Sequence, residues 1–308
     1  MKYLKNFVVI IATFFIVIIL ISIGSVMSKF EPGSGRIDKD SILTMELNGV
    51  ILDSKRFVSN LHKYSKKDKI KGILIRINSP GGAVGPSQEI YSEIKRVRDE
   101  IKKPIVVSCA SVAASGAYYA AVGADQIIAN PGSMLGSIGV IMEFANLENL
   151  YQWAKVQRYV IKSGPYKDAG SEFRKMTPEE KELFQNMINE VFAQFKQAVS
   201  KGRKLSMDVV DKYADGRVFT GQTAVKLGFA DQLGSYRDAL RVIGELSGLG
   251  ADPKTFSPPK KRPDVFDFLA ESKFGKKDIE GAIENILHTK YSGIPMYLMP
   301  GALGNSYK

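Results

Sequence analysis

Short apolar runs alternate with longer amphipathic segments between residues 41 and 246. The runs at 42–47, 70–77 and 104–108 are largely apolar, which is typical of strands buried in a parallel sheet. The segments at 85–101 and 178–201 read as helices instead. We expect further strands at 125–129, 137–141 and 156–161, and further helices at 53–65, 206–214, 221–227 and 236–246. Strands that alternate with helices predict an α/β fold, in which helices cover a mostly parallel sheet.

The longest apolar run lies near the N-terminus, where residues 7–26 carry no charge. A helix of that length spans about 30 Å, the hydrocarbon thickness of a bilayer. Because Lys2 and Lys5 precede the run, we expect a retained single-pass anchor in the cell membrane, with a cytoplasmic N-terminus and an extracytoplasmic domain. A cleavable signal peptide is the main alternative, but the run is long and no clean Ala-x-Ala site follows it.

Proline, glycine and charge mark the expected boundaries along the chain. Residues 28–40 are rich in glycine and serine, and residues 252–263 contain four prolines and a basic cluster. We therefore expect a membrane anchor at 1–28, a linker at 29–40, a folded domain at 41–247, and a C-terminal linker, helical extension and flexible tail at 248–308. Within that last part, 264–287 is amphipathic and 293–308 is apolar and punctuated by proline and glycine.

Composition and charge narrow the classes of function. The net charge of +11 is high, but the basic runs are scattered and lack interleaved aromatic residues. Nucleic-acid binding is therefore poorly supported, and a basic face near anionic lipid fits better. The single cysteine, Cys109, excludes an intrachain disulfide, and two histidines, His62 and His288, are too few for a zinc site built on several of them. We expect no metal and no cofactor, and neither histidine lies in a segment that resembles part of a catalytic triad.

Ser115 is the candidate nucleophile. It lies among small residues, at the point where an apolar strand gives way to an alanine-rich helix. The free N–H groups of a helix start favour developing negative charge, and small neighbours let other backbone approach. The alternative is that Ser115 only caps the helix. It does not fit the Gly-x-Ser-x-Gly elbow, because Ala113 and Ala117 stand where that motif has glycine.

A serine nucleophile also needs a base and donors for an oxyanion. Lys167 follows an expected strand and the turn at 163–166, although an ordinary surface lysine is the alternative reading. A lysine serves as a base only when its amine is neutral. The turn Asn-Ser-Pro-Gly-Gly at 78–82 follows a strand, at the end where open α/β sheets place their sites. Its glycines let backbone amides approach a ligand closely, and it lacks the Gly-Lys-Ser/Thr ending of a phosphate loop.

Several motifs stand together in an ordered series. These are Asn-Ser-Pro-Gly-Gly at 78–82, Ala-Ala-Ser-Gly-Ala-Tyr-Tyr-Ala at 113–120, Gly-Ser-Ile-Gly at 136–139 and Ser-Gly-Pro-Tyr-Lys-Asp at 163–168, followed by 217–222 and 224–234. With them, residues 41–246 resemble the signal peptide peptidase A family of membrane-bound serine peptidases, in its short single-domain bacterial form. The resemblance implies a ClpP/crotonase-like fold, a spiral of βαβ units, preceded by one transmembrane helix.

The resemblance also implies roles for individual residues. Ser115 would be the nucleophile and Lys167 the general base, 52 positions apart in the chain. Gly82 and Gly116 would supply the amides of an oxyanion hole, and Ser137 would orient the lysine. The implied substrates are apolar peptides such as cleaved signal peptides, and the implied assembly is a ring-like homo-oligomer, commonly an octamer. The family's C-terminal tails can behave like substrates, which the apolar residues 294–303 would suit.

Three rival readings stay open at this point. A crotonase-like enzyme that acts on acyl thioesters would share the fold and the glycine loop, but the anchor and the Ser/Lys pair count against it. A catalytically silent membrane scaffold belongs to a different class and would keep its function without Ser115. A regulatory or quality-control protease for particular membrane proteins would have the same sequence features as a signal peptide peptidase.

Overall fold

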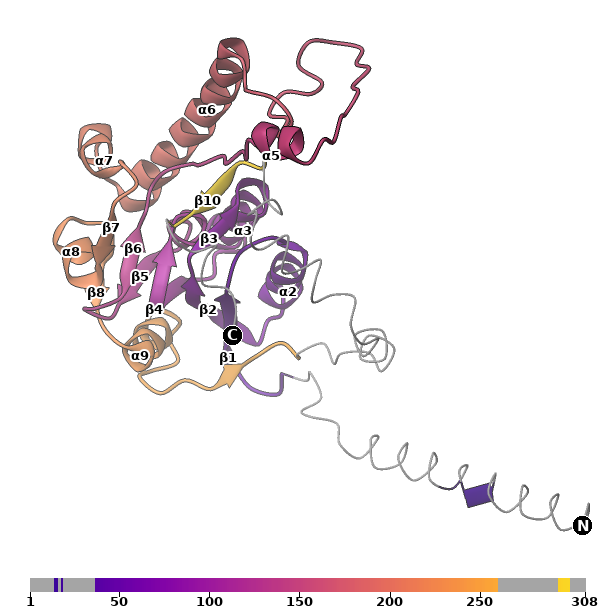
Figure 1. Cartoon of the computed structure of the whole chain (residues 1–308). Coiled ribbons are helices and arrows are strands. Elements are labelled where there is room, and N and C mark those ends of the chain that lie inside the picture. Colours follow the sequence, from indigo (N-terminus) through magenta and orange to yellow (C-terminus); the bar gives the residue numbers. More distant parts are fainter. Residues whose placement is uncertain (1–13, 16–17, 19–36, 260–292, 300–308) are drawn as a thin grey trace, which may run out of the picture. The chain divides into compact units, whose positions relative to one another are not determined.

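The computed structural model describes residues 14–15, 18, 37–259 and 293–299 (Figure 1). The chain divides into two units, Met1–Asp38 and Lys39–Lys308, and the fold below is that of the second. Most of the expected anchor at 7–26 and the expected helices at 264–287 lie outside the described residues. Among the residues described, no helix has the length and apolar character needed to cross a membrane.

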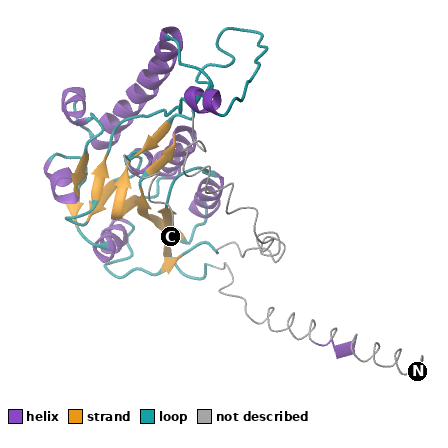
Figure 2. Ribbon diagram, in the orientation of Figure 1, coloured by secondary structure: helices purple, strands orange, loops and turns teal. Residues whose placement is uncertain are grey.

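A mixed sheet forms the centre of the second unit (Figure 2). Its main path runs in the order β7-β6-β4-β2-β1-β9, and β5 and β8 extend it from β4. Every strand pair is parallel except β6 with β7. The strands are β1 (Ser41–Asn48), β2 (Ile70–Ser79), β4 (Ile105–Ala114), β5 (Gln126–Ala129), β6 (Met134–Gly136), β7 (Val218–Thr220), β8 (Gln232–Leu233) and β9 (Thr255–Phe256). The expected α/β fold with a mostly parallel sheet is confirmed, and the sheet takes in β9 beyond residue 247.

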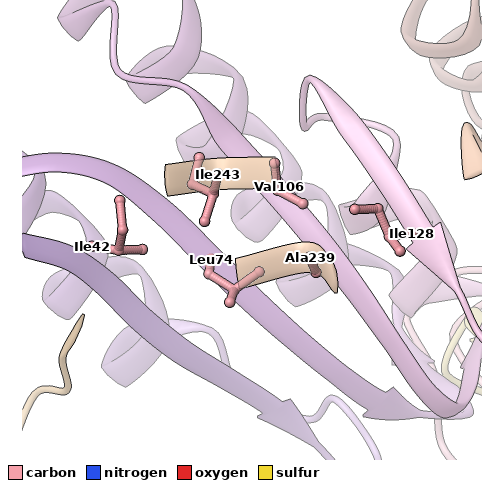
Figure 3. Packing of buried hydrophobic residues seen from close by; sticks show 6 residues of the cluster. All are labelled: Ile42, Leu74, Val106, Ile128, Ala239 and Ile243. Carbon is pink, nitrogen blue, oxygen red and sulfur yellow. The ribbon is translucent and has the colours of Figure 1, made fainter. Parts of the chain in front are cut away.

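Helices cover both faces of this sheet. α9 lies on one face, and α2 and α3 lie on the other (Figures 1 and 3). The helices are α2 (Lys55–Ser65), α3 (Val84–Arg96), α4 (Gly116–Ala121), α5 (Glu148–Trp153), α6 (Pro178–Arg203), α7 (Met207–Tyr213), α8 (Gly221–Lys226) and α9 (Tyr236–Leu246). A short π-helical turn at Val97–Ile101 ends α3. Each helix expected from the sequence between residues 53 and 246 is therefore present.

One layer of the core lies between the sheet and α9. Ile42, Leu74, Val106 and Ile128 come from four neighbouring strands and point to the same side, where they meet Ala239 and Ile243 (Figure 3). All six are fully buried. The two α9 residues are four positions apart, which places them on one face of a helix. This packing holds β4 in the middle of the sheet, and the candidate site begins where β4 ends.

Two of the expected strands are wrong. Residues 137–141 are not a strand, because the chain leaves β6 at Gly136 and Ser137, which have φ of 89° and 51°, outside the region that strands occupy. Residues 156–161 form no strand either, since no neighbouring strand pairs with them, and they lie in the open segment between α5 and α6 (Figure 1). β4 is also longer than expected and continues to Ala114.

Candidate active site

Ser115 occupies a strained turn between β4 and α4. Its φ of 54° and ψ of −119° lie in a region that residues with a side chain rarely adopt, at a cost of about 1–3 kcal/mol. Two backbone hydrogen bonds hold the turn: the Ser115 N–H donates to the Gly136 carbonyl over 2.7 Å, and the Tyr119 N–H donates to the Ser115 carbonyl over 2.8 Å. Such strain between a strand and a helix is the geometry of a nucleophile elbow. The elbow forms although Ala113 and Ala117 stand where the Gly-x-Ser-x-Gly motif has glycine.

The Ser115 hydroxyl is buried and has no hydrogen-bond partner among the described residues. The side chain does not cap α4, so the alternative reading as a simple N-cap is wrong. A buried polar group without a partner costs free energy and is uncommon in folded proteins. The hydroxyl is thus free to give its proton to a base, and no described residue is placed to accept it.

Gly82 and Gly116 lie against each other beside Ser115. A Cβ built on Gly116 would be 3.2 Å from the Gly82 nitrogen, and one built on Gly81 would be 2.7 Å from the Gly116 nitrogen. The two amides therefore border the same small space. A side chain on Gly82 would overlap the Ile51 backbone, and one on Gly116 would overlap the Ser87 hydroxyl. Neither position has room for a side chain, and the approach of their amides to a ligand stays a prediction.

Ser137 lies on the other side of the turn. Its neighbour Gly136 pairs with Ala114 in the ladder between β4 and β6 and accepts the Ser115 N–H. Ser137 itself is buried, and its N–H donates to the Arg217 carbonyl over 2.8 Å. The structure thus gathers Ser115, Gly116, Gly82 and Ser137 at the carboxyl ends of β4, β6 and β2.

Lys167 is the predicted site residue that the structure does not bring to this cluster. It is exposed on the long segment between α5 and α6, which loops away from the sheet (Figure 1). Its amine has no hydrogen bond or ion pair within the described part of the chain, and none joins it to Ser115. Apolar side chains at the end of α5 and on this segment are exposed as well: Trp153, the last residue of α5, is 81% exposed, Tyr159 85% and Ile161 fully.

The C-terminal segment lies along β3, beside Gly82. β10 (Met296–Leu298) pairs antiparallel with β3 (Gly81–Ala83), and this register sets Tyr297 opposite Gly82. On its other edge, Met296 exchanges two backbone hydrogen bonds with Ile141, of 2.9 and 3.0 Å. A Cβ on Gly116 would lie 3.1 Å from the Tyr297 Cβ. An extended strand therefore lies between β3 and residue 141, next to the nucleophile.

Tyr297 is fully buried in an aromatic pocket. Its ring stacks on Tyr119 with centroids 5.1 Å apart and lies 4.8 Å from Phe195. The phenol donates to the Val191 carbonyl over 3.2 Å and accepts from the Gln88 amide over 3.4 Å. Sequence reasoning pointed to the tail but missed this pocket, because Gln88, Tyr119 and Phe195 come from three helices and share no motif.

The remaining reactive groups in the described part of the chain do not form a second site. Burial raises the pKa of the Cys109 thiol to about 12, so it is inert as a nucleophile. His62 lies on α2, where its ring contacts Arg96 and Lys66 rather than any residue of the cluster. No group of three His, Cys, Asp or Glu among the described residues could hold a metal ion.

Comparison with known proteins identifies two sequence profiles. Residues 98–250 match peptidase family S49, and residues 35–135 match Clp protease. The second match assigns a Clp protease-like α/β fold to the sheet that carries Gly82 and Ser115. The first spans the elbow, Ser137 and Lys167.

Three relatives illustrate the range of the similarity. The "Putative protease" of Synechocystis sp. is 41% identical over 215 residues, 70% of this chain and 77% of the relative. The "Putative signal peptide peptidase SppA" of Enterococcus faecium is 34% identical over 65% of this chain, and the match spans 61% of that relative. "Protease 4" of Salmonella typhi is 31% identical over 76% of this chain, which spans only 39% of it.

Proposed function

The chain belongs to peptidase family S49, as a serine peptidase of the signal peptide peptidase A group, and we propose that it cleaves apolar peptides with a Ser115–Lys167 dyad. The observation that carries the proposal is the strained elbow at Ser115, whose free hydroxyl lies beside two converging glycine amides and a bound extended strand. Such an arrangement suits nucleophilic attack on a peptide carbonyl.

The reaction proceeds in two halves. The neutral Lys167 amine takes the Ser115 proton while the oxygen bonds to the peptide carbonyl carbon. The amides of Gly82 and Gly116 stabilise the resulting oxyanion. The peptide C–N bond then breaks, and protonated Lys167 gives its proton to the departing amine. Water, deprotonated by Lys167, attacks the acyl ester, and Ser115 leaves with the proton, which restores the enzyme.

The dyad forms when a second copy of the chain docks on the segment that carries Lys167. Three observations support this: Lys167 is exposed, the Ser115 hydroxyl has no hydrogen-bond partner in the described part of the chain, and an apolar surface is exposed at Trp153, Tyr159 and Ile161. Exposed apolar surface of this kind is typical of protein interfaces. A homo-oligomer, such as a ring with its sites facing a shared cavity, would cover it. Ser137 would then orient the incoming lysine.

Substrates bind as extended strands between β3 and residue 141. The tail's own pairing with β3 supports this mode, since strand addition supplies main-chain hydrogen bonds for any sequence and leaves selection to side-chain pockets. Remnant signal peptides have the required apolar character. An N-terminal anchor at 7–26 in the cell membrane would hold the outward-facing domain close to such peptides and raise their effective concentration.

Removal of the tail should accelerate the enzyme. We expect deletion of residues 293–308 to raise kcat/KM for an apolar fluorogenic peptide about tenfold, because the tail competes for the groove at a high effective concentration. Deletion of 300–308 alone, which leaves β10 in place, should have no effect. Thermal unfolding of both variants would check that the exposed aromatic pocket does not destabilise the fold. An unchanged or lower rate on deleting 293–308 would show that the tail is no competitor.

Covalent labelling tests the proposed function directly. A fluorophosphonate probe should modify the full chain once, and mass spectrometry should place the adduct on the peptide that contains Ser115. The variant Lys167→Ala should label much more slowly, whereas Lys175→Ala on the same segment should label like the wild type. Absence of an adduct on Ser115, together with binding of an acyl-CoA, would favour the crotonase-like alternative. An unlabelled protein that binds neither ligand would favour the scaffold.

A further inference from the structure

An ion-pair network surrounds the turn that carries Lys167. The Arg174 guanidinium donates to one carboxylate oxygen of Asp168 over 3.2 Å and lies 3.0 Å from the other in an ion pair. It also donates to both carboxylate oxygens of Glu180, at 2.5 and 2.9 Å. It also donates to the Asp168 carbonyl over 3.1 Å. Lys162 adds a second cation, with its amine 2.5 Å from Asp168. One arginine that binds two carboxylates through a planar fork has little freedom to move.

The network joins that turn to the start of α6. Glu180 is buried and closes a capping box with Thr177, in which each residue accepts the other's backbone N–H. On the other side, the turn is closed by backbone hydrogen bonds from Lys167 to Gly164 and from Ser171 to Asp168, of 3.2 and 3.1 Å. Arg174 connects the turn that carries Lys167 to the capping box at the start of α6. Its hydrogen bonds to Asp168 and to Glu180 tie the turn to the start of α6.

We propose that Arg174 is the positioning residue for the general base, because it fixes the Lys167 turn on α6 and keeps the Asp168 carboxylate from pairing with Lys167. The inference rests on the proposed role of Lys167 as the base. Asp168 follows Lys167 directly in the chain, so its carboxylate is the natural partner of that amine. In the structure it faces Arg174 and Lys162 instead, and the Lys167 amine has no partner among the described residues.

The charges around the turn explain why the Asp168 carboxylate must be kept away from the Lys167 amine. Besides Lys167 itself, the charged groups between residues 162 and 181 are four cations and four anions: Lys162, Asp168, Glu172, Arg174, Lys175, Glu179, Glu180 and Lys181. Hydrogen bonds from Arg174, and then from Lys162, hold the pKa of Asp168 down to about 2. Asp168 is thus charged at any working pH. A free carboxylate beside the amine would favour its protonated form, which cannot act as a base.

The pH profile of the full-length enzyme separates this role from a purely structural one. In Arg174→Gln we expect the acid limb of the kcat/KM profile to move about 1 pH unit upward, because released Asp168 stabilises protonated Lys167. At a pH on that limb, the rate should fall about tenfold. Arg174→Lys, which keeps the charge, should leave the limb in place. The double variant Arg174→Gln/Asp168→Asn should return the limb to its wild-type position, although kcat stays low because the turn is still released.

Controls keep the inference distinguishable from the function on which it rests. Arg241→Gln removes an exposed arginine–glutamate pair on α9 and should leave both rate and profile unchanged. If Lys167→Ala keeps full activity, the proposed dyad fails. If Lys167→Ala is inactive but Arg174→Gln shows a wild-type acid limb, or loses rate without moving the limb, only the role of Arg174 is overturned. A limb that stays displaced in the double variant overturns it as well. Should Arg174→Gln not fold, Arg174→Lys carries the test, and a limb that moves in that variant overturns the role.

Discussion

Replacement of Ser115 by alanine is expected to lower kcat for peptide cleavage by at least about 10⁴-fold, the range seen when a hydrolase loses its nucleophile. The reason is chemical, since alanine has no hydroxyl to attack the peptide carbonyl from the elbow. The Ser115 hydroxyl makes no hydrogen bond among the described residues, so its removal leaves no partner unsatisfied. The variant should therefore fold normally. Cleavage of a fluorogenic apolar peptide and thermal unfolding would measure the two effects.

A second substitution at the same position tests the strain. Ser115→Gly should be as inactive as Ser115→Ala, yet more stable than it, because glycine adopts a φ of 54° without the cost of about 1–3 kcal/mol that a side chain carries there. Chemical denaturation would compare the free energies of unfolding. Equal stability of the two variants would show that the elbow stores no strain. Retained cleavage by either would remove Ser115 from the mechanism.

Helices were predictable from the sequence because their signals are local. α9 begins and ends at the residues expected, since Ser235 and Asp238 form a capping box within four positions. Strands depend on partners elsewhere in the chain. Residues 156–161 have the composition of a strand, but none of the described strands pairs with them, and their apolar side chains stay exposed. An apolar pattern of this kind predicts a buried strand. It fits equally well a surface that a second copy of the chain would cover.

The candidate site was likewise predictable only where its signals are local in the sequence. The small residues around Ser115 and the glycines at 81 and 82 indicated where backbone could come close, and the structure places them together. The elbow itself could not be predicted, because the hydrogen bond from Ser115 to Gly136 and the ladder between Ala114 and Gly136 hold it from β6. A motif search for flanking glycines would have rejected it. The pairing of Lys167 with Ser115 came only from the family resemblance and stays a prediction.

Loss of Lys167 should be nearly as damaging as loss of Ser115. We expect Lys167→Ala to lower kcat at least about 10³-fold, because an alkyl hydroxyl is a weak nucleophile without a base. Lys167→Arg should not rescue it, since a guanidinium does not give up its proton in proteins. Lys175→Ala, on the same exposed segment, is the matched control and should keep the wild-type rate.

Mixing the two inactive variants would show where the base comes from. If each site takes Ser115 from one copy and Lys167 from its neighbour, equal co-expression of Ser115→Ala and Lys167→Ala should restore about one quarter of the wild-type sites, those in which both donors are intact. The expectation follows from a free Ser115 hydroxyl and an exposed Lys167 in the single chain. Size-exclusion chromatography would confirm that mixed oligomers form. Mixed oligomers without activity would mean that the segment between α5 and α6 closes over its own chain, and the apolar residues around Lys167 would then need another partner.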